Sequence, residues 1–287
     1  MKLCRYDDNK IGLVRGRNLH DVTAILDALP PLRYPVAFGD HLIANLENLR
    51  PRMEQLADKA APRPIDKVRF LSPVANPSKI IGTPANYHAH VEEARRDAEI
   101  AVYSAGKQRT IEEQGLFLKA SSSLVGPSEG VPIRFPDKRN DHEIELVLII
   151  GKEGSRIPRD KALDYVAAYS LGLDMTVRGP QDRSFRKSCD GYSVLGPWIV
   201  TADEIADPDN VPLSLSVNGE TRQDTNTSYL IYDIRRLIEF ASEYYTLYPG
   251  DVYYTGTPEG VGPVKPGDRL SGRSVPALGE LQIDVRG

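Results

Sequence analysis

The sequence predicts an α+β protein in which strands outnumber helices. Three observations lead to this prediction. The 287 residues include 22 prolines and 23 glycines, which indicates many turns and short strands. An unbroken apolar run from Leu146 to Ile150 is typical of a strand that is covered on both faces. Asn218-Gly219, between two short strand-like segments, is a strong hairpin signal because Asn-Gly accommodates the positive φ angles of a tight turn.

Residues 1–67 are predicted to form a small N-terminal α+β module, and residues 68–287 a larger second domain. The elements expected in the module are a hairpin, a short helix and a longer helix, at Lys2–Arg5 with Ile11–Val14, after Asp21, and from His41 to Ala60. Pro51 lies inside the longer helical pattern and is expected to kink or split it. A linker of sequence Ala-Pro-Arg-Pro follows at residues 61–64.

Three carboxylates interrupt the two apolar strands predicted in the middle of the larger domain. Glu143 and Glu145 lie two residues apart on one strand and therefore point to the same side. Asp174 interrupts the second apolar stretch, Tyr169–Met175. Carboxylates at the edge of a core lose hydration, which is costly unless they are paired or coordinate a metal. Such a group suits Mg²⁺ or Mn²⁺, although solvated side chains at a strand end would show the same pattern.

A helix that begins near Tyr87, with Asn86 as its cap, would place His90 and Glu93 side by side. A carboxylate beside an imidazole orients it and raises its basicity, which makes a general-base pair. A surface ion pair would have the same spacing. The mostly polar segment 95–114 follows, and we interpret it as a candidate mobile lid, although an ordinary exposed helix and loop would look the same. His90 and Glu93 lie on the helix that opens this segment, so we expect them to be exposed on the lid.

Composition excludes several classes of function. The formal net charge of -4 and the pI of about 5.8 give no sign of a nucleic-acid or anionic-membrane partner. The longest apolar run is too short to span a bilayer, and the N-terminus does not resemble a signal peptide. Cys4 and Cys189 are therefore expected to be free thiols, and the protein to be cytoplasmic.

A series of motifs follows in a defined order along the larger domain. They are Asn86-Tyr87-x-x-His90-x-x-Glu93, Phe117-Leu118-Lys119, Glu143-x-Glu145, Asp174-x-Thr176-x-Arg178-x-x-Gln181, Lys187-Ser188-x-Asp190, Leu195-Gly196-Pro197-Trp198 and Thr255-Gly256-Thr257-Pro258-x-Gly260-Val261-Gly262. The ordered set, from about Val68 to the C-terminus, resembles the fumarylacetoacetate hydrolase superfamily. The resemblance is to its branch of acylpyruvases and 2-hydroxyhepta-2,4-diene-1,7-dioate isomerases.

The resemblance implies a fold, an assembly and a site. The implied fold is a mixed β-sandwich roll of the fumarylacetoacetate hydrolase C-terminal type, usually in a homodimer. Glu143, Glu145 and Asp174 match the family's ligands for Mg²⁺ or Mn²⁺, sometimes Ca²⁺. The residues that match catalytic positions are His90, Glu93 and Lys187. Those assigned to substrate binding are Tyr87, Arg178, Gln181, Tyr192, Gly256 and Thr257.

The implied function is that of a divalent-metal-dependent hydrolase. It would cleave a C–C bond in an acylpyruvate or related 1,3-diketo acid, with a metal-stabilised enolate and a water activated by His90. The alternatives are a 2-oxo acid decarboxylase of the oxaloacetate type, a 2-hydroxy-dienoate isomerase of aromatic catabolism, and a metal- or ligand-binding module without turnover. Family members often have glycine where Pro84 or Ala85 stands. This departure and those at Gly179, residues 189–192 and Val194 lie near the substrate pocket and bear on substrate identity.

Overall fold

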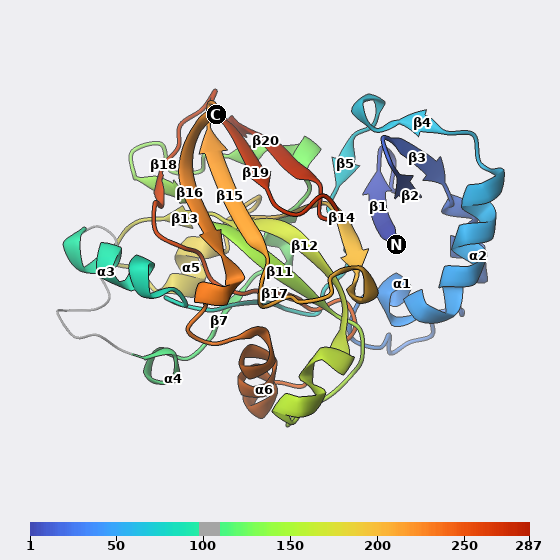
Figure 1. Ribbon diagram of the computed structural model, residues 1–287, viewed down its shortest axis with the longest axis horizontal. Coiled ribbons are helices and arrows are strands. Elements are labelled where there is room, and N and C mark those ends of the chain that lie inside the picture. Colours follow the sequence, from blue (N-terminus) through green and yellow to red (C-terminus); the bar gives the residue numbers. More distant parts are fainter. Residues whose placement is uncertain (98–109) are drawn as a thin grey trace.

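The computed structural model describes residues 1–97 and 110–287 and shows an α+β protein with more strand than helix. Within these residues the strands form three sheets, of twelve, three and five strands. Strands cross the centre of the molecule, whereas the helices lie at its periphery (Figure 1). The predicted strand-rich α+β class is confirmed.

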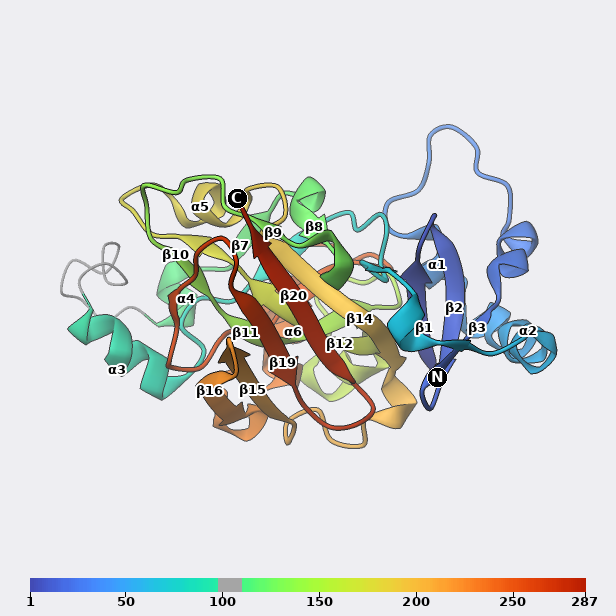
Figure 2. The same cartoon turned by 90° about the horizontal axis from the view of Figure 1, so that it is seen from above.

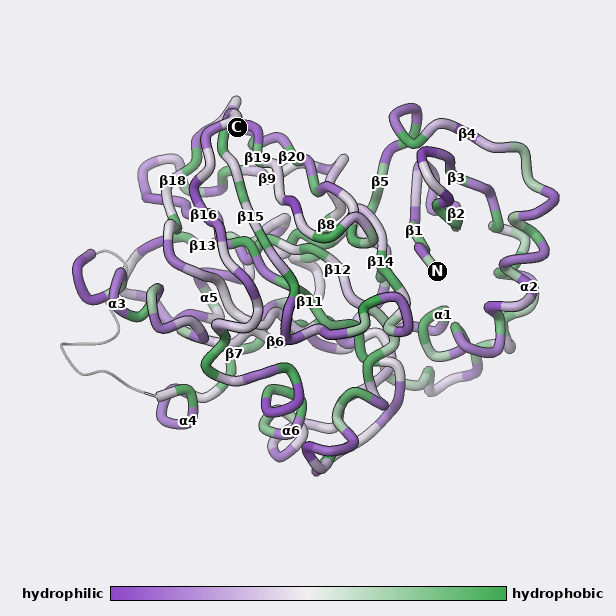
Figure 3. The backbone as a smooth tube through the Cα atoms, in the orientation of Figure 1, coloured by the Kyte–Doolittle hydropathy of each residue, from purple (hydrophilic) through white to green (hydrophobic). Residues whose placement is uncertain are grey.

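The twelve-stranded sheet forms the centre of the molecule. Its main path runs through β14 (Ser193–Thr201), β12 (Val166–Asp174), β11 (Ile144–Ile150), β17 (Val252–Tyr254), β6 (Ile80–Gly82) and β7 (Phe117–Lys119), and β8 (Leu124–Val125) pairs with β14. All seven residues of β11 are buried, as the apolar run in the sequence predicts. The tube in Figure 3 shows hydrophobic colour along stretches of these central strands and a mixture of polar and hydrophobic colour on the outer helices.

The N-terminal strands extend the same sheet beyond β14. They are β1 (Lys2–Tyr6), β2 (Lys10–Arg15), β3 (Asn18–Asp21) and β4 (Arg63–Pro64), with β5 (Phe70–Leu71) paired to β1. The predicted hairpin is confirmed in β1 and β2. Antiparallel pairing of Lys2 with Val200 joins β1 to β14, and Figure 1 shows the two strands side by side. The domain boundary at residue 67 stays a prediction.

The helices of the N-terminal segment differ from the prediction in one respect. The expected long helix is two helices, α1 (His41–Ala44) and α2 (Leu46–Lys59), which follow a 3-10 helix at Thr23–Ala28. The break falls at Asn45, whose side chain donates a hydrogen bond to the carbonyl of His41 at 2.8 Å. Pro51 lies inside α2 without splitting it, because buried Leu49 and Met53 anchor the helix on either side. No helix in residues 1–97 and 110–287 has the length and apolar character needed to cross a membrane.

The five-stranded sheet packs on one face of the central sheet, and the two form one hydrophobic core. Its strands are β16 (Glu220–Asn226), β15 (Pro212–Val217), β19 (Arg269–Arg273), β20 (Glu280–Arg286) and β9 (Val131–Pro132). The predicted turn between β15 and β16 is confirmed, with φ of 52° at Asn218 and 85° at Gly219. The packing is close, since a Cβ on Gly272 would lie 2.8 Å from Cδ1 of Ile144.

A small third sheet and two helices complete the larger domain. They are β13 (Thr176–Val177), β10 (Asn140–His142) and β18 (Gly262–Pro263), with α5 (Arg183–Lys187) and α6 (Ile234–Tyr244). β13 follows β12 and β10 precedes β11, so this sheet lies where the end of β12 meets the start of β11. Figure 2 shows β10 on the same side of the molecule as α3 and α5.

The capping role predicted for Asn86 is wrong. The helix α3 (His88–Arg96) has Tyr87 at its N-cap, without a side-chain cap. The Asn86 amide instead donates to the carbonyl of Thr255 at 2.8 Å and accepts from the backbone N–H of Tyr232 at 2.7 Å, since it is fully buried between distant segments. Of the candidate lid, only the end of α3 and α4 (Ile111–Gln114) are described, and the part at 98–109 lies outside the described residues.

Candidate active site

Antiparallel pairing of β11 with β12 brings the three predicted metal ligands together. The end of β12 lies beside the start of β11, and the N–H of Asp174 donates to the carbonyl of Glu143 at 2.9 Å. Each of Glu143, Glu145 and Asp174 offers an oxygen within 4.8 Å of the others. All three side chains are buried, so the structure supports the geometric expectation of a carboxylate cluster.

Two buried lysines hold this cluster from one side. Lys187, on α5, donates from Nζ to Glu143 at 2.6 Å, to Asp174 at 2.7 Å and to the hydroxyl of Thr176 at 2.6 Å. Lys119, at the end of β7, pairs with the other oxygen of Asp174. Lys119 is a site residue that the sequence analysis quoted within a motif but gave no role. Side chains alternate along β7, so that Phe117 and Lys119 are buried and Leu118 is exposed. This alternation could have predicted that Lys119 points toward the core.

The three carboxylates differ in their electrostatic surroundings. Burial disfavours the charged form of Glu143, but Lys187 and Arg178 outweigh it and lower its pKa. Burial, reinforced by the negative charge of Asp174, raises the pKa of Glu145. Glu145 accepts a hydrogen bond from the N–H of Gly256 at 2.5 Å and forms no ion pair in the described part of the chain. A buried carboxylate without a cation fits a site for a hard divalent metal ion, which prefers oxygen ligands.

Arg178 is part of a chain of ion pairs rather than a free cation. Its Nη2 donates to Glu143 at 2.9 Å and its Nε to Asp141 at 2.7 Å. Asp141 also pairs with Arg139 at 2.7 Å, and Arg139 with Asp97, just beyond α3, at 2.7 Å. The chain therefore links the end of α3 to the carboxylate cluster. Substrate binding by Arg178 stays a prediction, and in the structure its guanidinium contacts Glu143 and Asp141.

His90 and Glu93 form the predicted pair on α3. Nδ1 of His90 lies 2.9 Å from Oε2 of Glu93, whose other oxygen accepts from the N–H of Gly260 at 2.9 Å. His90 is close enough to Glu143 to contribute to the low pKa of that carboxyl. The expectation that His90 is exposed on a lid is wrong, since it is only 8% exposed. The hydrogen bond between Glu93 and Gly260 holds this face of α3 against the larger domain, and His90 on that face is therefore buried.

The loop after β17 closes the site and is held by a residue that the sequence analysis missed. Thr257 donates its hydroxyl to the carbonyl of Ile144 at 3.0 Å and accepts from Nε2 of Gln223 at 2.9 Å. Oε1 of Gln223 in turn accepts from the N–H of Ile144 at 3.0 Å and lies 3.1 Å from Nδ1 of His142. Gln223 is 1% exposed in an otherwise largely exposed strand, and nothing in the local pattern distinguishes it.

The other residues assigned to substrate binding lie in different surroundings. Tyr87 is 1% exposed, and its hydroxyl has no hydrogen-bond partner in the described residues. The hydroxyl of Tyr192 donates to the side chain of Asn140 at 2.6 Å, so it is already engaged. Gln181 is exposed in the turn before α5.

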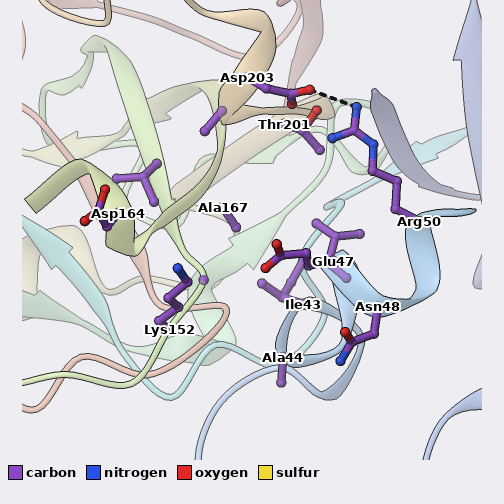
Figure 4. A pocket seen from close by; sticks show the side chains of 14 residues that line it. Ile43, Ala44, Glu47, Asn48, Arg50, Lys152, Asp164, Ala167, Thr201 and Asp203 are labelled. Atoms are coloured by element: carbon purple, nitrogen blue, oxygen red, sulfur yellow. Dashed lines mark hydrogen bonds and ion pairs between the residues drawn. The ribbon is translucent and has the colours of Figure 1, made fainter. Parts of the chain in front are cut away.

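A separate pocket of about 370 Å³ lies between the N-terminal helices and the larger domain (Figure 4). Glu47 and Arg50 on α2 face Lys152, Asp164 and other residues across it. Ala167 lines this pocket near the start of β12. It is seven residues from Asp174, which is about 23 Å along the strand. This pocket therefore takes no part in the carboxylate site.

Comparison with known proteins gives the family. The fumarylacetoacetate (FAA) hydrolase C-terminal family matches residues 79–286. The chain belongs to the fumarylacetoacetate hydrolase family. It is 50% identical to a maleylpyruvate hydrolase of Aquipseudomonas alcaligenes over 286 residues, covering 100% of this chain and 99% of the relative.

Solved structures of family members agree with this assignment. Maleylpyruvate hydrolase from Sphingobium sp. SYK-6, in complex with manganese(II) ion and pyruvate, is 39% identical with a TM-score of 0.83, covering 100% of this chain and 99% of the other. A 5-carboxymethyl-2-hydroxymuconate delta-isomerase from Mycobacterium smegmatis is 31% identical with a TM-score of 0.71, covering 100% and 98%. The predicted family, fold and hydrolase class are confirmed. The roles of single residues, the homodimer and the compartment stay predictions.

Proposed function

We propose that this protein is a divalent-metal-dependent hydrolase that cleaves maleylpyruvate, or a closely related acylpyruvate, to pyruvate and a carboxylic acid. The observation that carries the proposal is the oriented His90–Glu93 pair beside a buried cluster of three carboxylates. The similarity to two maleylpyruvate hydrolases over the full chain supports the choice of substrate.

Glu143, Glu145 and Asp174 are the residues that would hold the metal ion, because they supply three buried oxygen ligands with one carboxylate still without a cation. When bound there, a divalent cation supplies positive charge that stabilises the enolate leaving group. Mn²⁺ is favoured by the manganese complex of the Sphingobium enzyme, and Mg²⁺ suits the same oxygen ligands. Lys187 donates its three N–H groups to Glu143, Asp174 and Thr176, so it is placed to fix two of these carboxylates beside the substrate.

His90 is the proposed general base. Since the Glu93 carboxylate is an acceptor, Nδ1 of His90 donates to it, and Nε2 is left with its lone pair to take a proton from water. The water oxygen then bonds to the acyl carbonyl carbon, and the bond from that carbon to the methylene group breaks. The bonding electrons remain on the methylene carbon as the pyruvate enolate, which a proton converts to pyruvate.

The proposal is tested by incubating the Mn²⁺-loaded protein with maleylpyruvate and assaying pyruvate and the released acid. Equal amounts of the two products, lost on addition of a chelator, are expected. Oxaloacetate with an assay for CO₂, and a 2-hydroxy-dienoate followed by absorbance, examine the decarboxylase and isomerase alternatives. If maleylpyruvate is not cleaved and one of these two substrates is turned over, the corresponding alternative replaces hydrolysis.

A further inference from the structure

One cation beside the active site, Arg183, is without a carboxylate. Arg183 begins α5, and its Nη2 donates to the side-chain oxygen of Gln114 at 2.9 Å. Its guanidinium carbon lies 5.6 Å from the centre of the Phe117 ring. In residues 1–97 and 110–287 no Asp or Glu forms an ion pair with it, and its Nε and Nη1 have no acceptor.

The neighbouring cations, unlike Arg183, have carboxylate partners. Lys119, Lys187 and Arg178 each pair with at least one buried carboxylate. Arg183 is partly buried, and burial together with the positive charge of Arg186 lowers its pKa, although Glu143, Asp174 and Asp182 act in the opposite direction without pairing with it. Its Nε and Nη1 are not fully buried, so a ligand can reach them. Partial burial weakens the hydration of a cation, and an anionic ligand would offset that loss.

The position of Arg183 relates it to the carboxylate cluster. Arg183 and Lys187 are four residues apart on α5 and share one face of the helix, roughly 6 Å apart along its axis. Both lie over the ring of Phe117, with Nζ of Lys187 5.4 Å from its centre. Lys187 contacts Glu143 and Asp174 directly, and the backbone of Arg183 lies about one helical turn from that of Lys187 on the same helix.

We propose that Arg183 binds a second carboxylate at the acyl end of the substrate, and that it selects acylpyruvates whose acyl group ends in a carboxylate. This inference rests on the proposed function and adds a residue that determines specificity. With the 2-oxo acid end at the carboxylate cluster, a short diketo acid is long enough for its far end to extend over about one helical turn, toward Arg183. The free N–H donors of Arg183 suit a carboxylate because charge-assisted hydrogen bonds are strong.

The first test compares maleylpyruvate, which has the second carboxylate, with acetylpyruvate, which ends in a methyl group. Arg183→Gln should lower kcat/KM for maleylpyruvate by about 10²-fold, the effect of removing one partner of a desolvated charge pair, and change acetylpyruvate less than about threefold. Arg183→Lys keeps the charge and should fall between. Arg52→Gln, on the exposed face of α2, is the matched control and should change neither rate. An equal loss on both substrates from Arg183→Gln would overturn the inference.

The second test does not depend on turnover and separates this inference from the proposed function. Calorimetry measures binding of maleate and of isocrotonate, in which a methyl group replaces one carboxylate, to the Mn²⁺-loaded protein. The wild type should bind maleate more tightly, and Arg183→Gln should remove the difference while its Tm stays near that of wild type. Equal binding of the two acids by the wild type would reject the role of Arg183. A wild type that prefers maleate but hydrolyses neither acylpyruvate would reject the proposed function alone.

Discussion

Nδ1 of His90 lies 2.9 Å from Oε2 of Glu93, and this contact orients the imidazole on a helix at the edge of the fold. The second oxygen of Glu93 accepts from the backbone of Gly260, so the carboxylate holds both the ring and the loop that follows β17. A base oriented in this way is suited to activate one water in one position.

Replacing His90 should remove hydrolysis while metal binding is retained. His90→Gln should lower kcat/KM for maleylpyruvate by about 10²–10⁴-fold, the share of a positioned general base, and Glu93→Gln should cost less because the ring remains. Decarboxylation of oxaloacetate needs no activated water, so it should fall much less. Steady-state kinetics with both substrates and calorimetry with Mn²⁺ check this. A wild-type rate of hydrolysis in His90→Gln would place the base elsewhere.

Glu145→Gln should separate metal affinity from stability. The variant removes a negative ligand, so calorimetry should show a steep loss of Mn²⁺ or Mg²⁺ affinity. Burial and Asp174 raise the pKa of Glu145, which means that its charged form is disfavoured in the metal-free fold. The metal-free variant should therefore have a Tm equal to or above that of wild type near neutral pH. Unchanged metal affinity would remove Glu145 from the site.

Lys119→Met should destabilise the metal-free protein by about 3–5 kcal/mol, because it breaks a fully buried ion pair and leaves Asp174 with less positive charge nearby. A divalent cation neutralises the same carboxylate. Excess Mn²⁺ should therefore raise the Tm of this variant more than that of wild type, as differential scanning calorimetry would show. An equal metal-induced shift in both proteins would mean that Lys119 and the cation do not share Asp174.

The ion pair of Arg50 on α2 with Asp203, at 2.9 Å, should give a small acid-sensitive contribution to stability. Hydrogen bonds from Arg50 and Thr201 lower the pKa of Asp203 to about 2. The contribution is therefore present above the ordinary pKa of 3.8 and is lost as the pH falls toward 2. Because the pair is largely exposed, it is worth less than about 1 kcal/mol. A double-mutant cycle with Arg50→Gln and Asp203→Asn should show coupling at pH 7 that shrinks below pH 4, and coupling independent of pH would contradict this.

A homodimer is expected from the family resemblance, and closed two-fold dimers are the commonest assemblies of soluble proteins. Light scattering coupled to size exclusion should give about twice the 31.8 kDa of one chain. A mass near that of one chain across the micromolar range would contradict the expectation.

Local patterns were sufficient to predict several elements of this protein. The hairpin at β1 and β2, the Asn218–Gly219 turn and the buried strand β11 follow from alternation, turn chemistry and apolar runs, which depend only on neighbouring residues. Glu145 lies on β11 as predicted, whereas Glu143 lies in the one-residue gap between β10 and β11 rather than on the same strand. The ordered motifs then identified the family, and with it the carboxylate cluster.

Contacts between distant segments were decided only by the tertiary structure. The pairing of β1 with β14 joins residues about two hundred positions apart, and Gln223 is buried through bonds to Ile144 and Thr257. Burial of His90 depends on the contact of its helix with the loop at Gly260. Arg183 has no ion pair among the described residues because the nearby carboxylates pair with other cations. A sequence shows which groups carry charge, but desolvation and pairing depend on distances that arise only when the strands and helices pack together.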